Sequence, residues 1–176
     1  MGIDVKIKYH EDYNLNDWGP LRYAKAGDAG VDLRSVEKGV VYPKNSAIFR
    51  CGISIELPDN YEMQVRSRGG LAFKNDIQVH FGTVDSGYRG EIMLKVFNLH
   101  NKEWLVVEPG MRLAQAIFCY VPQIQFSTVD ELNESERGDD AFASSGLYDF
   151  QEQRKKDSEC DCEPKCSDCN CKIIIE

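Results

Sequence analysis

The 176-residue sequence lacks the long apolar runs of membrane proteins, because no stretch approaches the ~18 consecutive apolar residues that a transmembrane helix needs. Residues 1–10 alternate polar with apolar side chains and contain no apolar signal-peptide core. We therefore expect a soluble protein of the cell interior, located in the cytoplasm, with no membrane partner.

Positive charge is scarce. Lys and Arg number 21 against 29 Asp and Glu, which gives a net charge of −8. Such a balance argues against non-specific nucleic-acid binding, which depends on cations that neutralise phosphates, so no nucleic-acid partner is expected. It does not exclude a small anionic ligand, because a few focused cations can hold a phosphate within an acidic protein.

Cysteine is also scarce in the body of the chain, where Cys51 and Cys119 stand alone in apolar surroundings. Two isolated cysteines make no disulfide framework, and we expect both to be small core residues. The remaining five, at positions 160, 162, 166, 169 and 171, crowd the C-terminal end. The segment from Cys160 to Cys171 could hold one Zn²⁺ with four thiolates, or could be a charged extension with reduced thiols.

A sustained apolar period of 3.6 residues is absent as well. Short stretches of β-branched and aromatic residues instead alternate with Gly and Pro turns, which is typical of an antiparallel all-β barrel or sandwich of the jelly-roll kind. The expected strands are residues 5–9, 31–35, 40–42, 47–57, 61–66, 91–99, 104–107 and 113–121. We expect at most one short helix, at residues 70–74.

The amino-acid composition of the chain changes after Pro122. Residues 128–147 are polar and include a Gly-, Ala- and Ser-rich patch, and residues 148–176 are charged and then cysteine-dense. The sequence therefore predicts a β-barrel core at residues 1–127, a mobile arm at residues 128–147, and a tail at residues 148–176 that is disordered or binds metal.

Five short segments are dense in Gly, Asp, Arg, Gln and Ser, the residue types that handle phosphates. Taken singly, each also fits an ordinary turn or cap, so their order and spacing together carry the signal. They are Ala29-Gly30-Val31-Asp32-Leu33, Arg68-Gly69-Gly70-Leu71-Ala72-Phe73-Lys74, Gly82-Thr83-Val84-Asp85-Ser86-Gly87-Tyr88-Arg89-Gly90-Glu91, Arg112-Leu113-Ala114-Gln115, and the run of residues 137–146.

In this order the segments resemble the five motifs of the all-β, homotrimeric deoxyuridine triphosphatase (dUTPase) family. The likeness covers about residues 1–147, and the third segment is the most specific. It implies hydrolysis of dUTP to dUMP and pyrophosphate with Mg²⁺, a homotrimer with shared active sites, and a C-terminal arm that closes over a neighbour's nucleotide.

Residue by residue, the resemblance implies that Asp85 activates the attacking water and that Tyr88 packs on the deoxyribose and excludes a 2′-hydroxyl. Asp32 would bind Mg²⁺ through water. The remaining implied substrate contacts are Arg68, Gly69, Gly70 and Gln115 at the phosphates, His80, Gly82, Thr83 and Val84 at the uracil, and Arg137, Phe142, Ser144 and Ser145 in the arm.

The sequence departs from the family pattern in two of these segments. Gly69 stands where the second motif has Ser, and Ser67 lies just before Arg68 instead. In the arm, Asp140, Ala141 and Ala143 replace three glycines, which predicts a slower or differently closing enzyme.

Two other functions remain open at this point. A dCTP deaminase shares the fold but carries a Glu in the strand after the third motif, where this sequence has Lys95. A cation cannot shuttle protons there as a carboxylate would. The second alternative is a catalytically weak, nucleotide-binding regulatory protein on the same scaffold.

Overall fold

The computed structural model describes residues 2–135 and 138–139. The chain divides into two units, Met1–Gln125 and Phe126–Glu176. The expected arm contacts Arg137, Phe142, Ser144 and Ser145, the substitutions at 140, 141 and 143, and the cysteine-rich tail lie outside the described residues.

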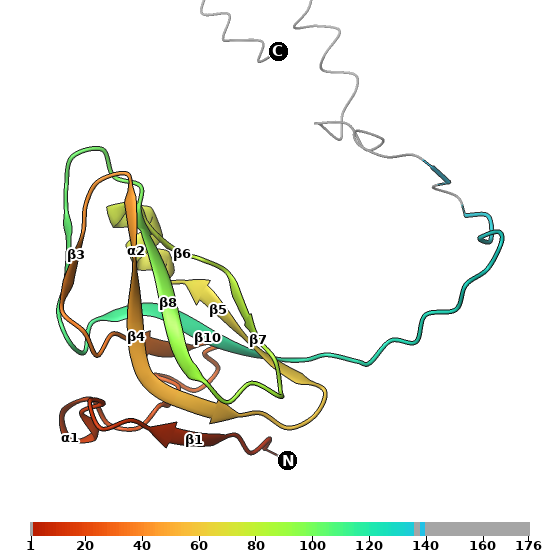
Figure 1. The fold of residues 1–176 in the computed structure, drawn as a ribbon, viewed down its shortest axis with the longest axis horizontal. Coiled ribbons are helices and arrows are strands. Elements are labelled where there is room, and N and C mark those ends of the chain that lie inside the picture. Colours follow the sequence, from red (N-terminus) through yellow and green to blue (C-terminus); the bar gives the residue numbers. More distant parts are fainter. Residues whose placement is uncertain (1, 136–137, 140–176) are drawn as a thin grey trace, which may run out of the picture. The chain divides into compact units, whose positions relative to one another are not determined.

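Two four-stranded antiparallel sheets build the first unit (Figure 1). One has the order β1-β4-β8-β6, and its strands are Lys6–Tyr9, Asn45–Glu56, Glu91–Asn98 and Ile77–Val79. The other has the order β2-β10-β5-β7, and its strands are Val31–Arg34, Arg112–Tyr120, Tyr61–Ser67 and Gly82–Val84. A two-stranded ribbon pairs β3 (Gly39–Val41) with β9 (Leu105–Val107).

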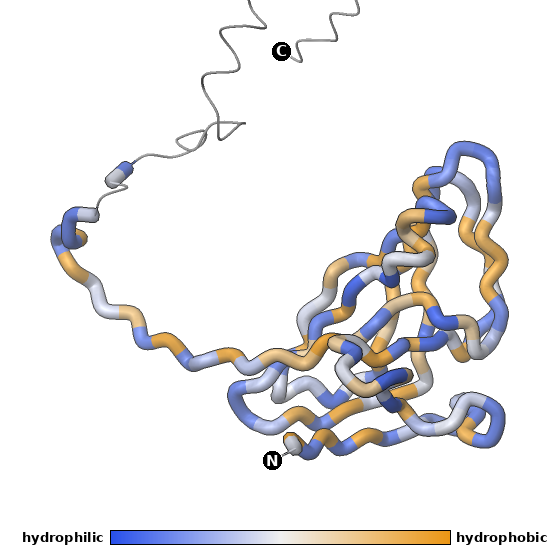
Figure 2. The backbone as a smooth tube through the Cα atoms, turned by 180° about the vertical axis from the view of Figure 1, so that it is seen from behind, coloured by the Kyte–Doolittle hydropathy of each residue, from blue (hydrophilic) through white to orange (hydrophobic). Residues whose placement is uncertain are grey.

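Alternation along the strands creates the core. In β8, Ile92, Leu94 and Val96 are buried while Met93 and Lys95 are exposed, the period of two that a pleated strand imposes. Figure 2 shows hydrophobic and hydrophilic positions following one another along the sheets. The inward side chains of both sheets form one hydrophobic cluster, as expected for an all-β jelly-roll type of fold.

A bulge interrupts the longest strand, β4, where its pairing with β8 shifts between Arg50 and Ser54. Gly52 lies within it with a φ of +66°, a left-handed conformation that favours glycine. A Cβ at this position would also lie 2.5 Å from Val36 Cγ1, so the close approach and the backbone conformation both require glycine.

The structure holds more elements than the sequence predicts. The expectation of at most one short helix is wrong, because α1 (Leu15–Trp18) precedes the expected helix, α2 (Gly69–Asn75). The four-residue α1 is too short for an apolar period, and the side chain of Asn14 caps it by accepting from Asp17 N at 3.1 Å. No helix in the described ranges has the length and apolar character needed to cross a membrane.

The two cysteines of the body lie in the first unit. Cys51 is 1% exposed within the β4 bulge, and this burial raises the pKa of its thiol. Cys119, near the end of β10, is half-buried. Cys51 is therefore the core residue that the sequence predicts, while Cys119 lies at the margin of the core.

Candidate active site

The first candidate region is an arginine–aspartate cluster made of Asp32, Arg68 and Arg112. Asp32 Oδ1 lies 2.8 Å from Arg68 Nε, and Asp32 Oδ2 lies 3.1 Å from Arg112 Nη1. Each carboxylate oxygen thus has its own guanidinium, and the cluster as a whole carries net positive charge. A half-buried cationic cluster of this kind suits a phosphorylated ligand.

Strand register brings these residues together from distant parts of the chain. Asp32 in β2 pairs with Gln115 in β10, which in turn pairs with Arg66 in β5. Arg68 follows β5 directly and is the N-cap residue of α2, and its Nη1 donates to Arg112 O at 3.0 Å. The end of β5 therefore aims Arg68 across the sheet at β10 and β2.

Gln115 lies beside the cluster in a defined orientation. Its Nε2 donates to Ser67 O at 3.0 Å. A Cβ on Gly30 would lie 2.5 Å from Gln115 Oε1 and 2.9 Å from Ile117 Cδ1. Gly30 is therefore glycine because the amide of Gln115 occupies the space of a side chain.

The hydroxyl of Ser67 is committed to the fold. Ser67 Oγ accepts from Val79 N at 2.9 Å and also donates to Val79 O at 3.2 Å, which ties β5 to β6. It therefore does not replace the motif serine that Gly69 lacks. Gly69 and Gly70 are exposed at the start of α2, where the first N–H groups of a helix have no intrahelical partner.

The second candidate region is a pocket of about 250 Å³ beside the turn of residues 85–88, which we call the aspartate turn. The lining residues are Val65, Gly82, Thr83, Val84, Asp85, Tyr88, Glu91, Ile92 and Met93. Of the five residues predicted at the uracil and the sugar, all but His80 line this pocket, namely Gly82, Thr83, Val84 and Tyr88. They lie there together with Asp85, which the sequence predicts as the catalytic base.

The aspartate turn is built by the end of β7. Val84 pairs with Met63 in β5, and Asp85 follows as the chain leaves the sheet. Tyr88 N donates to Asp85 O at 3.1 Å and closes the turn. The Asp85 carboxylate is exposed and makes no hydrogen bond or ion pair with another side chain in the described part of the chain, so it can bind a water or a ligand.

His80 lies apart from this pocket. Its backbone N donates to Lys95 O at 2.9 Å, where β6 meets β8, and its side chain is exposed. The N–H of His80 is therefore already used by the sheet. Backbone groups for a base would come from Gly82, Thr83 and Val84, which line the pocket.

The two regions lie at different ends of β5. Asp85 comes directly after β7, which ends opposite Met63, whereas Gln115 pairs with Arg66 and places Asp32 at the far edge of the sheet. With strands about 4.8 Å apart and a rise of about 3.4 Å per residue, the backbones of Asp85 and Asp32 are on the order of 20 Å apart. Within one chain the two regions do not share a ligand-sized space.

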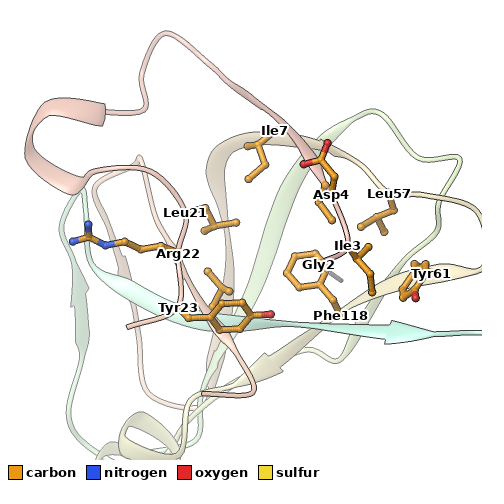
Figure 3. A pocket seen from close by; sticks show the side chains of 12 residues that line it. Gly2, Ile3, Asp4, Ile7, Leu21, Arg22, Tyr23, Leu57, Tyr61 and Phe118 are labelled. Atoms are coloured by element: carbon orange, nitrogen blue, oxygen red, sulfur yellow. The ribbon is translucent and has the colours of Figure 1, made fainter. Parts of the chain in front are cut away.

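A larger pocket, of about 540 Å³, lies elsewhere (Figure 3). Its walls are mainly apolar and come from the N-terminal segment, residues 21–23, Val31, Leu57, Tyr61 and Phe118. None of the predicted site residues lines it, and Asp4 and Arg22 are its only charged lining residues. The chemistry-bearing residues therefore favour the smaller pocket.

Sequence reasoning missed the role of Arg112. It belongs to the fourth segment, but its ion pair with Asp32 joins residues 80 positions apart. The only sequence signal was an arginine beside Gln115, and the partner becomes visible only through the pairing of β10 with β2.

Taken together, these features are those of an all-β protein with a half-buried cationic cluster of Asp32, Arg68 and Arg112. The dUTPase family model matches residues 16–146. The chain belongs to the dUTPase family.

Curated relatives cover most of the chain. The deoxyuridine 5′-triphosphate nucleotidohydrolase of Alkaliphilus metalliredigens is 45% identical over 148 residues, 82% of this chain and 99% of the relative. The enzyme of the same name from Clostridium acetobutylicum is 45% identical over 147 residues, 82% of this chain and 98% of the relative.

Solved structures show the same fold. The dUTPase of Staphylococcus bacteriophage 80alpha with dUPNHPP matches with a TM-score of 0.73 at 23% identity, over 82% of this chain and 99% of that chain. A dUTPase mutant of phage phi11 of S. aureus, described with a structural Mg(II) ion, matches with a TM-score of 0.67 at 18% identity, over 74% of this chain and 99% of that chain. The all-β jelly-roll expectation is confirmed.

Proposed function

We propose that this protein is a dUTP diphosphatase, which hydrolyses dUTP to dUMP and pyrophosphate with Mg²⁺. The observation that carries the proposal is the exposed carboxylate of Asp85, which has no ion-pair partner among the described residues, at the wall of a pocket of about 250 Å³ that Tyr88 also lines. Support comes from family membership and from the curated relatives named for this activity at 45% identity.

Asp85 is the residue that activates water in this proposal. The carboxylate accepts a proton from the water while the water oxygen bonds to the α-phosphorus of dUTP. The bond from that phosphorus to the bridging oxygen of the β-phosphate breaks, and pyrophosphate leaves with the bond's electron pair. The open position of Asp85 leaves room for the water within hydrogen-bond reach.

The pocket beside Asp85 would hold the nucleoside. Backbone groups of Gly82, Thr83 and Val84 would meet the uracil edge, and the ring of Tyr88 would lie against C2′ of the sugar. A 2′-hydroxyl would have no space there, so the protein would prefer dUTP to UTP.

Arg68 and Gln115, with the amides of Gly69 and Gly70, would hold the phosphates. Arg68 is aimed by its contacts with Asp32 and Arg112, so it is preorganised for a triphosphate. Arg137, Phe142, Ser144 and Ser145 of the proposed arm would complete the site, as the family resemblance implies.

The donor set fits a Mg²⁺ ion that arrives with the nucleotide. No group of three or more His, Cys, Asp or Glu side chains suited to a metal is found among residues 2–135 and 138–139. Two guanidiniums neutralise Asp32, so a bare cation gains little there. A bound triphosphate would engage the two guanidiniums and add negative charge, so that a cation would then be favoured beside Asp32. Because Mg²⁺ keeps several of its waters, Asp32 would hold the Mg²⁺ ion through a water.

The site needs more than one copy of the chain. Asp85 and Asp32 stand on the order of 20 Å apart in one chain, by strand spacing and rise per residue. A single nucleotide cannot reach both. We infer that Asp85 of one copy faces the arginine–aspartate cluster of another, in a homotrimer.

Deamination of dCTP is the less favoured chemistry. Lys95 lies exposed on β8 with its Nζ 5.5 Å from the ring centroid of Phe97, a cation–π contact. The nearby carboxylate of Glu91 is held by Arg50 and by the backbone of the β4 bulge. No carboxylate on this strand is therefore available as the deamination acid and base.

A substrate panel in oxygen-18 water tests the activity. We expect pyrophosphate release from dUTP well above that from dCTP, dTTP and UTP, loss of turnover with EDTA, and oxygen-18 in dUMP. Label in pyrophosphate would contradict attack at the α-phosphorus. Tight dUTP binding with no release would favour the regulatory, nucleotide-binding alternative.

Subunit complementation tests the shared site. Asp85→Asn and Arg68→Ala proteins would each be inactive, but their mixture should regain part of the activity after subunit exchange, since some mixed sites take both intact halves. The matched control mixes Asp85→Asn with Tyr88→Ala, two changes in the same half, and should gain no activity beyond that of the Tyr88→Ala protein itself. Equal results from both mixtures would argue against a shared site.

The remaining proposals concern the tail and the location. We propose that the segment from Cys160 to Cys171 binds one Zn²⁺ and that the protein acts in the cytoplasm. Metal analysis of the full chain tests the first point. A Cys166→Ser, Cys169→Ser double variant should lose bound Zn²⁺, and a metal content equal in both proteins would refute the site.

A further inference from the structure

The ring of Tyr88 is held back against the strand that follows its turn. Tyr88 Oη donates to Glu91 O at 3.0 Å, although the residue is 45% exposed. Gly90 lies directly beneath the ring. A Cβ at position 90 would overlap Tyr88 Oη and would lie 2.5 Å from Cζ and 3.0 Å from Cε2, so the ring can take this position only over glycine.

The acceptor of this hydrogen bond is itself anchored. Glu91 Oε2 lies 2.8 Å from Arg50 Nε, and Glu91 Oε1 accepts from Gly52 N at 2.8 Å. Both partners belong to the β4 bulge, and Arg50 Nη1 also pairs with Asp12 Oδ2 at 2.7 Å. The carboxylates of Glu91 and Asp12 raise the pKa of Arg50, so this anchor stays charged. The start of β8 is thereby tied to the neighbouring strand.

We propose that Gly90 and Glu91 are positioning residues for Tyr88, and that they set the selectivity of this site for 2′-deoxyribonucleotides over ribonucleotides. Gly90 leaves the space in which the ring lies, and Glu91 fixes the carbonyl that holds its hydroxyl. The inference rests on the proposed function, because it takes the pocket beside Asp85 as the nucleoside site.

The same turn contains a matched glycine. Gly87 lies between Asp85 and Tyr88, and a Cβ there would meet nothing within 4 Å. Neither Gly87 nor Gly90 has a left-handed φ, so alanine is compatible with the backbone at both positions. At Gly90 the three nearest atoms all belong to the exposed ring of Tyr88, which can swing away without disturbing the core.

The experiment compares Gly90→Ala with Gly87→Ala in the full chain, by kcat/KM for dUTP and for UTP. Because a steric contact in a pocket is worth 10–200-fold, we expect the dUTP-to-UTP ratio to fall about tenfold or more in Gly90→Ala and to change less than about twofold in Gly87→Ala. Tyr88→Ala should lose the same selectivity. Tyr88→Phe keeps the ring but loses the bond to Glu91 O, so its ratio should be intermediate. Thermal unfolding should be unchanged in all four.

Glu91→Gln provides the second variant. An amide cannot accept from both Arg50 Nε and Gly52 N, so one anchor is lost and the dUTP-to-UTP ratio should fall in the same direction as in Gly90→Ala. A fall in kcat alone, with the ratio unchanged, would indicate a merely structural role for Glu91 and would contradict its assignment as a positioning residue.

Calorimetric binding of dUMP and UMP separates this inference from the proposed function, because it needs no turnover. An unmodified protein that binds dUMP in preference to UMP but releases no pyrophosphate would defeat the proposed function and leave the inference standing. A Gly90→Ala protein with unchanged preference, beside a Tyr88→Ala protein that has lost it, would overturn the inference alone. Binding of neither nucleotide by the unmodified protein would overturn both.

Discussion

The arginine–aspartate cluster and the aspartate turn each contain an aspartate, but the two carboxylates have opposite surroundings. In the cluster, each oxygen of Asp32 contacts its own guanidinium, from Arg68 and from Arg112. In the turn, Asp85 is exposed and makes no hydrogen bond or ion pair with another side chain of the described residues. Without a nucleotide, the carboxylate of Asp32 is therefore engaged by its own region, while that of Asp85 is left open for a ligand.

Because of this difference, we expect Asp32 to contribute to the stability of the fold and Asp85 to the reaction. Removing a paired carboxylate leaves guanidiniums without their acceptor, so the fold itself should suffer. Removing an unpaired, exposed carboxylate should cost the fold little and should remove only what it does to a bound ligand. Four experiments test this contrast.

The largest effect is expected for Asp85→Asn. Loss of a positioned base lowers kcat by about 10²–10⁴-fold, whereas the free energy of unfolding should change by less than about 0.5 kcal/mol. Steady-state pyrophosphate release and urea denaturation measure the two quantities. A strongly destabilised variant would show that Asp85 has structural partners after all.

Asp32→Asn, in contrast to Asp85→Asn, should destabilise the fold. The ion pairs are half-exposed, so their combined loss should lower the free energy of unfolding by only about 1 kcal/mol. Urea denaturation at low and high salt checks this, and the difference from wild type should shrink at high salt. If Asp32→Asn and Asp85→Asn proved equally stable, the contrast between the two regions would fail.

Gly30→Ala should act through Gln115. The added methyl group would displace the amide that now lies 2.5 Å from that position, and we expect KM for dUTP to rise about threefold to tenfold from the loss of one hydrogen bond. Gln115→Ala is the reference. The double variant should be no worse than Gln115→Ala, and additive effects would mean that Gly30 acts by another route.

The smallest effect is expected outside both regions, at the exposed pair of Lys6 and Glu56, 2.7 Å apart. The hydrogen bond and charge of Lys6 lower the pKa of Glu56, and Glu56 raises the pKa of Lys6. The stabilisation from Glu56 is therefore present above its ordinary pKa and is lost as pH falls through the lowered one. That from Lys6 is lost as pH rises through the raised one.

Thermal unfolding of a Lys6→Met, Glu56→Gln double variant measures how much this exposed pair contributes to stability. Its difference from wild type should be small near neutral pH and should vanish at both acid and strongly alkaline pH. A difference that persists at acid pH would point to packing of the Lys6 stem and not to charge.

Strand positions proved predictable where alternation is long. The expected strand at 91–99 is observed at Glu91–Asn98, because every second position from Ile92 to Asn98 is buried and this alternation specifies the inward face. Although the equally short β3 and β9 were among the expected strands, the three-residue strands β6 and β7 were not. They are defined by their partners, β8 and β5.

The candidate site was predictable within one short segment but not between segments distant in the sequence. The residues of one short segment, Asp85 and Tyr88, were expected together and lie in one pocket. His80, expected with them, has its backbone N–H engaged by β8. Arg112, for which no contact was expected, pairs with Asp32.

What the sequence alone determined was local: the alternating strands, the turns between them, and the order of phosphate-handling segments that identifies the family. Only the tertiary structure decided which side chains meet. Asp32 reaches Arg112 through the pairing of two strands, and Tyr88 lies over Gly90 because Glu91 is tied to Gly52 of the β4 bulge, 39 residues earlier. Such contacts depend on register, and register is set by the packing of the whole sheet and not by any one segment.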